Sequence, residues 1–159
     1  MPQLKILKQP NPILRKKSKD LSHKEIISPE LGKLILDMIK TMIKTDGVGL
    51  AAPQIGGNIR LVVINAKDGA FCLLNPKITK KSLLKELGQE GCLSIPGIFG
   101  QVKRHKKITV EYLDQNGKKI KLIAQGMMAR VIQHELDHLE GVLFIDKATS
   151  VEKVKIGKE

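Results

Sequence analysis

The sequence predicts an α+β fold. Three observations favour this class: a helical pattern precedes a block of short β-rich segments, a second helical pattern follows that block, and a hairpin signal joins the last two segments. No internal repeat, low-complexity segment or Gly/Ser/Pro-rich linker divides the chain. Because 159 residues suffice for one hydrophobic core, we expect a single domain over residues 1–159.

The first helix is predicted to begin at Ser28 and Pro29. Serine is a common N-cap residue, and proline suits the first turn because no backbone N–H is needed there. Apolar residues then follow helical spacing at Leu31, Leu34, Ile35, Met38, Met42 and Ile43. The pattern stops at Asp46 and Gly47, which form a turn signal.

Four short segments have the composition of β-strands. They are RLVVIN, FCLLN, KITVEYLD and KKIKLIAQ, at residues 60–65, 71–75, 107–114 and 118–125. The sequence QNG at residues 115–117 joins the last two and is typical of a tight hairpin. These two segments are therefore predicted to pair as antiparallel strands.

The second helix is predicted to run from about Met127 to Glu140, with Gly141 as its C-terminal stop. Four of its residues recur at spacings of four, three and four: Met127, Val131, His134 and His138. Residues at this spacing share one face of a helix. Because that face carries apolar side chains, we expect both histidines to point into the core.

The composition is that of a soluble globular protein. Hydrophobic residues make up 42% of the chain and charged residues 28%, and no apolar run is long enough to span a bilayer. Lys5 and Lys8 interrupt the N-terminal apolar residues, so we find no secretion signal. We therefore expect a cytoplasmic protein without a membrane partner, in which Cys72 and Cys92 are free thiols.

The chain is basic. Lysine and arginine outnumber aspartate and glutamate by 28 to 16, which gives a formal net charge of +12 and would suit a polyanion such as RNA. The lysines are spread along the chain, however, and only one tyrosine and three phenylalanines are present, so no stacking platform for bases is apparent. We expect weak steering toward anionic surroundings and no sequence-specific nucleic-acid site.

The sequence QHELDH, residues 133–138, contains the HExxH pattern of many zinc peptidases. Residues four apart rise about 6 Å along a helix and face the same side, so His134 and His138 can converge on one metal ion. Glu135 is turned about 100° from His134, which favours contact with a metal-bound water over metal ligation. Two core histidines bonded to backbone groups are the alternative.

A third metal ligand would have to lie upstream of the helix. Metzincin proteases need a third histidine where this chain has Phe144, and the short, lysine-rich tail offers no later helix with a glutamate ligand. Upstream, Cys92 follows Gly91 in QEGCLSIPG, whereas Cys72 in AFCLLN suits a small buried strand residue. Cys92 is the better candidate, and one thiolate with two imidazoles would suit zinc or ferrous iron.

The sequence GVGLAAPQIGG, residues 47–57, is rich in glycine and other small residues. It indicates a loop whose backbone approaches a ligand, with Gln54 as the only side chain able to donate a hydrogen bond. A plain turn between helix and strand is the alternative.

Together, GVGLAAPQIG, EGCLS and QHELDH resemble the three motifs of the peptide deformylase family, complete and in the family's order. The resemblance covers nearly the whole chain. It implies an α+β fold in which antiparallel strands surround a central HExxH-bearing helix, with a further helix toward the N-terminus. It also implies a metal-dependent hydrolase that removes formate from the N-formylmethionine of newly made polypeptides.

The resemblance carries the family's functional residues over by position. The implied metal ligands are Cys92, His134 and His138, with ferrous iron as the native ion and zinc or another divalent metal as substitutes. The implied catalytic residues are Glu135 as general acid/base, with the Gln54 side chain and the Leu93 backbone N–H as oxyanion donors. The implied substrate-binding residues are Val48, Gly49, Gly91, Met127 and Val131. For Met127 and Val131, ordinary packing is the alternative.

The implied partners are the nascent N-formylmethionyl polypeptide and, transiently, the ribosome. Ile98 and Phe99 stand where some family members place an arginine that contacts substrate. Two other functions fit parts of the sequence: a metal-dependent endopeptidase, and a basic RNA- or ribosome-associated protein with a structural or inactive metal site. The first differs in cutting internal bonds, and the second would need a fourth protein ligand, for which we find no candidate.

Overall fold

The computed structural model describes residues 3–154, in which helices pack on antiparallel sheets. The α-helices are α1 (His23–Ile26), α2 (Pro29–Lys44) and α3 (Met127–Leu139). Three short 3-10 helices are η1 (Pro12–Arg15), η2 (Ala52–Ile55) and η3 (Phe144–Asp146). No helix within these residues combines the length and apolar character that a bilayer crossing requires.

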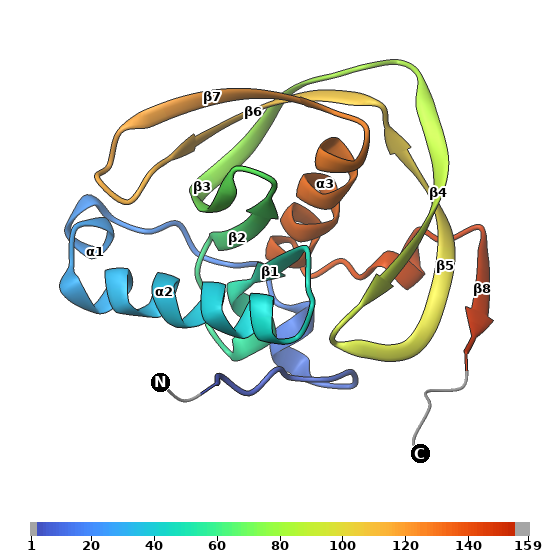
Figure 1. The fold of residues 1–159 in the computed structure, drawn as a ribbon, viewed down its shortest axis with the longest axis horizontal. Helices are drawn as coiled ribbons and strands as arrows, with labels where there is room; N and C mark the ends of the chain where they lie inside the picture. Colours follow the sequence, from blue (N-terminus) through green and yellow to red (C-terminus); the bar gives the residue numbers. More distant parts are fainter. Residues whose placement is uncertain (1–2, 155–159) are drawn as a thin grey trace.

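The strands form two antiparallel sheets, which surround α3 in Figure 1. The larger sheet has the order β1-β2-β3-β6-β7 and consists of Gly49–Ala51, Leu61–Ala66, Gly69–Lys81, Lys107–Leu113 and Lys119–Gln125. The smaller sheet has the order β4-β5-β8 and consists of Lys85–Cys92, Ile95–His105 and Ser150–Lys153. The predicted α+β class, with antiparallel strands around the HExxH-bearing helix, is confirmed.

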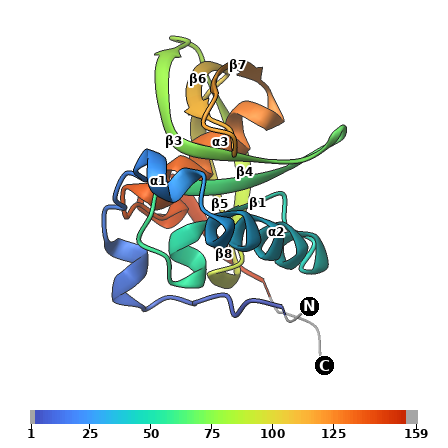
Figure 2. The same cartoon turned by 90° about the vertical axis from the view of Figure 1, so that its left-hand side faces the viewer.

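Strand β2 is buried on both faces. Because side chains alternate along a strand, Leu61 and Val63 pack in the core with α2, whereas Val62 and Ile64 pack in the core with α3. Figures 1 and 2 show the result from two directions, with α2 below the larger sheet and α3 in the middle of the molecule. The HExxH motif of α3 is therefore positioned by a hydrophobic cluster separate from the one that packs on α2.

Local signals explain the predicted elements. The Ser28 side chain accepts a hydrogen bond from the Leu31 backbone N–H at 3.2 Å, so α2 starts where predicted. In the β6–β7 turn, the Asp114 side chain accepts hydrogen bonds from the backbone N–H groups of Asn116 and Lys118, both at 2.9 Å. Helix α3 ends one residue before the predicted limit of Glu140.

Other elements differ from the sequence prediction. The stretch of residues 47–57, predicted as a loop, contains β1 and η2, so that prediction is wrong at Gly49–Ala51. Strand β3 continues past the predicted end at Asn75, because an irregular register between Leu74 and Lys77 carries it through the bend. Strands β4, β5 and β8 were not predicted: half of the residues of β4 are exposed and two are glycines, and β5 contains two glycines and a proline.

Candidate active site

Cys92, His134 and His138 converge on one point. Their ligand atoms all lie within 4.8 Å of one another, and Cys92 Sγ is 3.5 Å from His138 Nε2. Helix α3 supplies both histidines from its inward face, and the last residue of β4 supplies the cysteine. The structure thus brings together the three residues of the predicted ligand set.

The geometry of these three side chains fits a divalent metal ion. Bonds of about 2.3 Å to sulfur and about 2.05 Å to nitrogen at a tetrahedral angle would place the two ligand atoms roughly 3.5 Å apart. The observed separation of Cys92 Sγ and His138 Nε2 is 3.5 Å. In His134, Nδ1 is hydrogen-bonded to the Glu90 carboxylate at 2.9 Å, which leaves Nε2 available to bind a metal ion.

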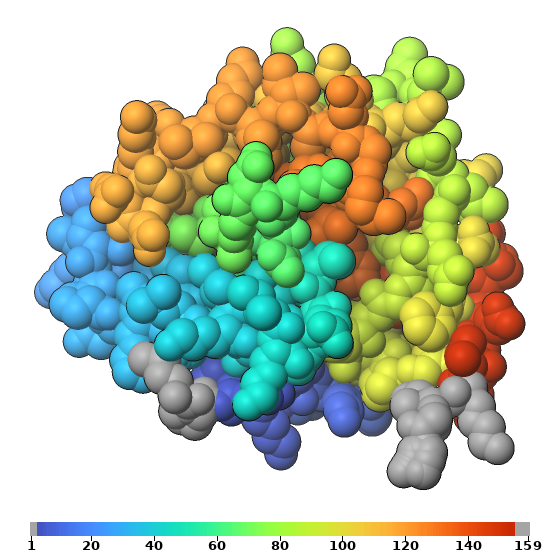
Figure 3. Space-filling view, viewed as in Figure 1, coloured from blue at the N-terminus to red at the C-terminus, as the bar shows by residue number. Residues whose placement is uncertain are grey.

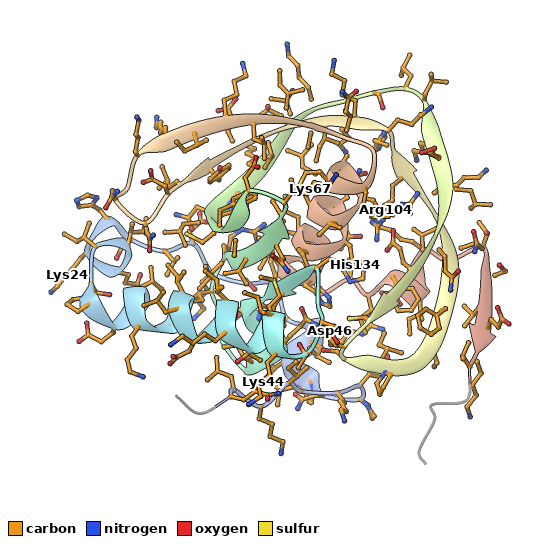
Figure 4. All side chains as sticks on the ribbon, in the orientation of Figure 1. Lys24, Lys44, Asp46, Lys67, Arg104 and His134 are labelled. Atoms are coloured by element: carbon orange, nitrogen blue, oxygen red, sulfur yellow. The ribbon has the colours of Figure 1, made fainter. Side chains whose placement is uncertain are left out.

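Glu90 anchors a buried network of charges behind His134. Arg104 binds its carboxylate through two hydrogen bonds of 2.8 Å, and Arg130 binds it through a third of 2.7 Å. Arg104 also pairs with Asp137 at 2.6 Å. Figure 4 shows Arg104 beside α3, on the side where β4 and β5 run.

The network keeps Glu90 ionised. Burial would raise the pKa of its carboxyl, but hydrogen bonds from Arg104 and His134 lower that pKa to about 2. An ionised acceptor at Nδ1 fixes the orientation and tautomer of His134. Neither Glu90 nor Arg104 was predicted to have a role in the site. The position of Glu90 within EGCLS was the available signal, and Arg104 carried none.

Glu135 lies buried beside the histidines, with Oε2 3.9 Å from His134 Nε2. Strand β1 approaches it so closely that a Cβ atom at Gly49 would lie 2.7 Å from Glu135 Cγ and 2.8 Å from Oε2. Glycine at residue 49 therefore makes room for the carboxylate. Burial raises the pKa of Glu135 to about 7, against an opposing effect of His134, so this carboxyl suits proton transfer near neutrality.

Gln54 is buried and oriented at both ends. Its Oε1 accepts a hydrogen bond from the Ala51 backbone N–H at 2.9 Å. Its Nε2 donates to Ser94 Oγ at 3.1 Å and lies 3.5 Å from Cys92 Sγ. The amide N–H₂ group is thereby aimed toward Cys92, one of the predicted metal ligands. Ser94, for which no role was predicted, is the buried hydrogen-bond acceptor that orients this amide.

A cavity of about 660 Å³ opens onto these groups. Ten of the eleven predicted site residues line it: Val48, Gly49, Gln54, Gly91, Cys92, Leu93, Met127, Val131, His134 and Glu135. His138 is buried behind them. The residues Val48 and Met127 are 58% and 69% exposed, which places them at the cavity mouth. Figure 3 shows α3 there, between the end of α2 and the β4–β5 region.

Cys72 lies elsewhere, in the core with α2. Burial raises the pKa of its thiol to about 11, so it stays protonated at neutral pH and is a poor metal ligand. Its predicted role as a small buried hydrophobic residue agrees with this position.

Comparisons with known proteins point to one family. A family model described as polypeptide deformylase matches residues 3–154. The peptide deformylase of Symbiobacterium thermophilum is 46% identical over 154 residues, which are 95% of this chain and 69% of that protein. The peptide deformylase of Syntrophomonas wolfei is 48% identical over 151 residues, which are 94% of this chain and 97% of that protein.

Solved structures agree with the sequence comparison. A peptide deformylase from Synechococcus elongatus, in complex with actinonin, superimposes with a TM-score of 0.89 at 43% identity, over 94% of this chain and 81% of that one. The enzyme from Thermotoga maritima gives a TM-score of 0.90 at 39% identity, over 94% of this chain and all (100%) of that one. The chain therefore belongs to the polypeptide deformylase family, metal-dependent enzymes that remove the N-formyl group from nascent peptides.

Proposed function

We propose that the 660 Å³ cavity is the deformylation site and that Cys92, His134 and His138 hold one divalent metal ion in it. The observation that carries this proposal is the convergence of three ligand atoms within 4.8 Å of one another, next to Glu135. We further propose that the site belongs to a single domain spanning residues 1–159.

In this mechanism Glu135 transfers a proton, and Gln54 and Leu93 stabilise the negative charge that develops on the substrate. When bound, the metal ion lowers the pKa of a water molecule and so supplies a nucleophile near neutral pH. Glu135 takes the proton from the water and later gives it to the departing amine. The Gln54 amide and the Leu93 backbone N–H donate hydrogen bonds to the formyl oxygen as it gains negative charge. The buried position of Gln54 strengthens its interaction with that charge.

The substrate would bind as an extended strand. Strand β1 is at one edge of the larger sheet and β4 is at one edge of the smaller sheet. Both border the cavity, so a peptide between them can pair with free backbone groups. We assign this pairing to Val48, Gly49 and Gly91, and the methionine side chain to a pocket beside Val48, Met127 and Val131. In support, an Acinetobacter baumannii deformylase that is 35% identical, with a TM-score of 0.88, was solved with Met-Ala-Ser bound.

We propose ferrous iron as the native ion and the cytoplasm as the location, with a transient contact to the ribosome. A site with one thiolate and two imidazoles accepts either iron or zinc, and affinity alone would favour zinc. Held by Cys92, His134 and His138, a ferrous ion would keep a coordination position open and could polarise the formyl group there. The exposed basic surface, with a chain charge of +12, suits weak attraction to anionic surroundings.

Formate release tests this function and the metal together. We expect the ferrous protein, prepared without oxygen, to release formate from formyl-Met-Ala but no acetate from acetyl-Met-Ala. The zinc form should be less active, and the ferrous form should lose activity in air as metal or thiolate is oxidised. An equally active, air-stable zinc form would contradict iron alone. Cleavage of internal peptide bonds in place of formate release would contradict the deformylation site.

Gln54→Ala should slow turnover. Removing one oxyanion donor raises the barrier by about 2.7 kcal/mol, which lowers kcat about a hundredfold with little change in KM. Steady-state kinetics on formyl-Met-Ala would measure both constants, with Gln115→Ala in the exposed β6–β7 turn as the matched control. A change confined to KM would make Gln54 a binding residue.

A further inference from the structure

Arg130 stands between two cavities. It lines the 660 Å³ cavity, and it also lines a neighbouring cavity of about 190 Å³ bordered by Glu86, Gly88 and Gly126. Within the described residues, only Met127 and Arg130 line both. Met127 is exposed at the mouth, whereas Arg130 is buried, so the arginine forms the inner partition.

The partition is fixed by hydrogen bonds on several sides. Nη1 of Arg130 donates to the Glu90 carboxylate at 2.7 Å and to the Val102 carbonyl at 2.9 Å. Nη2 donates to the Glu86 carbonyl at 2.7 Å. A guanidinium with three such acceptors loses its rotational freedom, and its planar fork becomes a rigid surface. Arg130 is therefore a wall rather than a mobile side chain.

Gly88 backs the wall from the side of the smaller cavity. A Cβ atom at residue 88 would lie 2.7 Å from Arg130 Cζ and 2.8 Å from Nη2, closer than side chains can approach. Gly88 lines the smaller cavity and is absent from the lining of the larger one. A side chain there would therefore push the guanidinium toward the larger cavity.

We propose that Arg130 is the end wall of the pocket for the first side chain of the substrate and that it limits the length of that side chain. The inference rests on the proposed pocket beside Met127 and Val131, one helical turn or less from Arg130 on α3. With the arginine in place, the pocket ends at the guanidinium. Without it, the smaller cavity becomes an extension of the pocket.

A series of formyl-X-Ala substrates tests the wall. X is norvaline, norleucine or aminooctanoic acid; norleucine matches methionine in length, and aminooctanoic acid is two methylenes longer. We expect the native protein to prefer norleucine over aminooctanoic acid by at least about tenfold in kcat/KM, as one misfit methylene can already produce such a factor. In Arg130→Ala this preference should fall below about threefold.

Arg130→Met separates the bulk of the wall from its charge. Both variants remove the ion pair with Glu90, which Arg104 still binds twice, but only alanine removes the bulk. Arg130→Met should therefore keep most of the preference for norleucine. Arg60→Ala, which removes an arginine paired with Glu140 away from the cavity, should leave the preference unchanged. Equal preferences in Arg130→Met and Arg130→Ala would overturn the proposal.

Gly88→Ala adds a methyl group against the Arg130 guanidinium from the side of the smaller cavity. This variant tests the wall even if Arg130→Ala fails to fold. We expect it to shift the preference from norleucine toward norvaline by about tenfold, and Gly88→Ala/Arg130→Ala should abolish that shift. A folded Gly88→Ala protein with the native preference would overturn the wall. If the native protein itself shows no dependence on side-chain length, the proposed pocket fails together with the wall.

Discussion

Glu135→Gln should retain its metal ion and lose between a hundredfold and about ten-thousandfold in turnover on formyl-Met-Ala. Glutamine keeps the size of the buried side chain next to Gly49, so the packing survives. It cannot accept the proton of the attacking water or return it to the amine. The measurement is kcat for formate release, with bound metal quantified on the same sample.

Glu140→Gln is the matched control for this variant. Glu140 follows α3 at the surface, where it pairs with Arg60 at 2.6 Å, and it does not line the cavity. Its loss removes a carboxylate from the same region without touching the reaction. Near-native turnover in metal-loaded Glu135→Gln would remove Glu135 from the proton-transfer role.

Cys92→Ala should abolish both metal retention and turnover. The thiolate is one of three protein ligands, and its loss leaves two imidazoles, which hold a divalent ion far more weakly than the full set. We expect the metal content after dialysis to fall from about one ion per chain to a small fraction, and turnover to fall at least about a hundredfold. A chelator should lower the melting temperature of the native protein and leave that of Cys92→Ala unchanged.

Cys72→Ala separates loss of a ligand from loss of a thiol. Cys72 packs in the α2 core and is kept protonated by burial, so its removal should cost some stability but no metal. If Cys92→Ala binds metal and turns over normally, both the ligand set and the mechanism built on it are wrong.

The sequence was most informative where local signals decide the structure. Ser28, Pro29 and the apolar spacing defined α2, and the hairpin signal at residues 115–117 defined β6 and β7. Helix α1 was missed although Ser22 and Glu25 form a capping box there, a signal that can be read from sequence. Strands β4 and β5 carry no such signal, because their stability comes from pairing with each other and from buried charges.

The candidate site also combines residues that local spacing predicts with contacts that only the tertiary structure creates. His134, Glu135 and His138 are neighbours on one helix, so their spacing alone brings them together. The partners of Glu90 cannot be read this way, because Arg104 reaches it through the pairing of β4 with β5, and Arg130 reaches it from α3. The close contact of Gly49 with Glu135 likewise depends on where β1 lies against α3.

Strand β2 has a consequence for how the molecule unfolds. Its alternate residues belong to two different hydrophobic clusters, and β3 repeats the arrangement, with Leu73 in one cluster and Leu74 in the other. Strands β2 and β3 contribute side chains to both clusters. Neither cluster can therefore unfold without disturbing the strands that support the other. Helix α3, which carries both histidines, and helix α2 are thus coupled thermodynamically, and we expect them to melt in one cooperative transition.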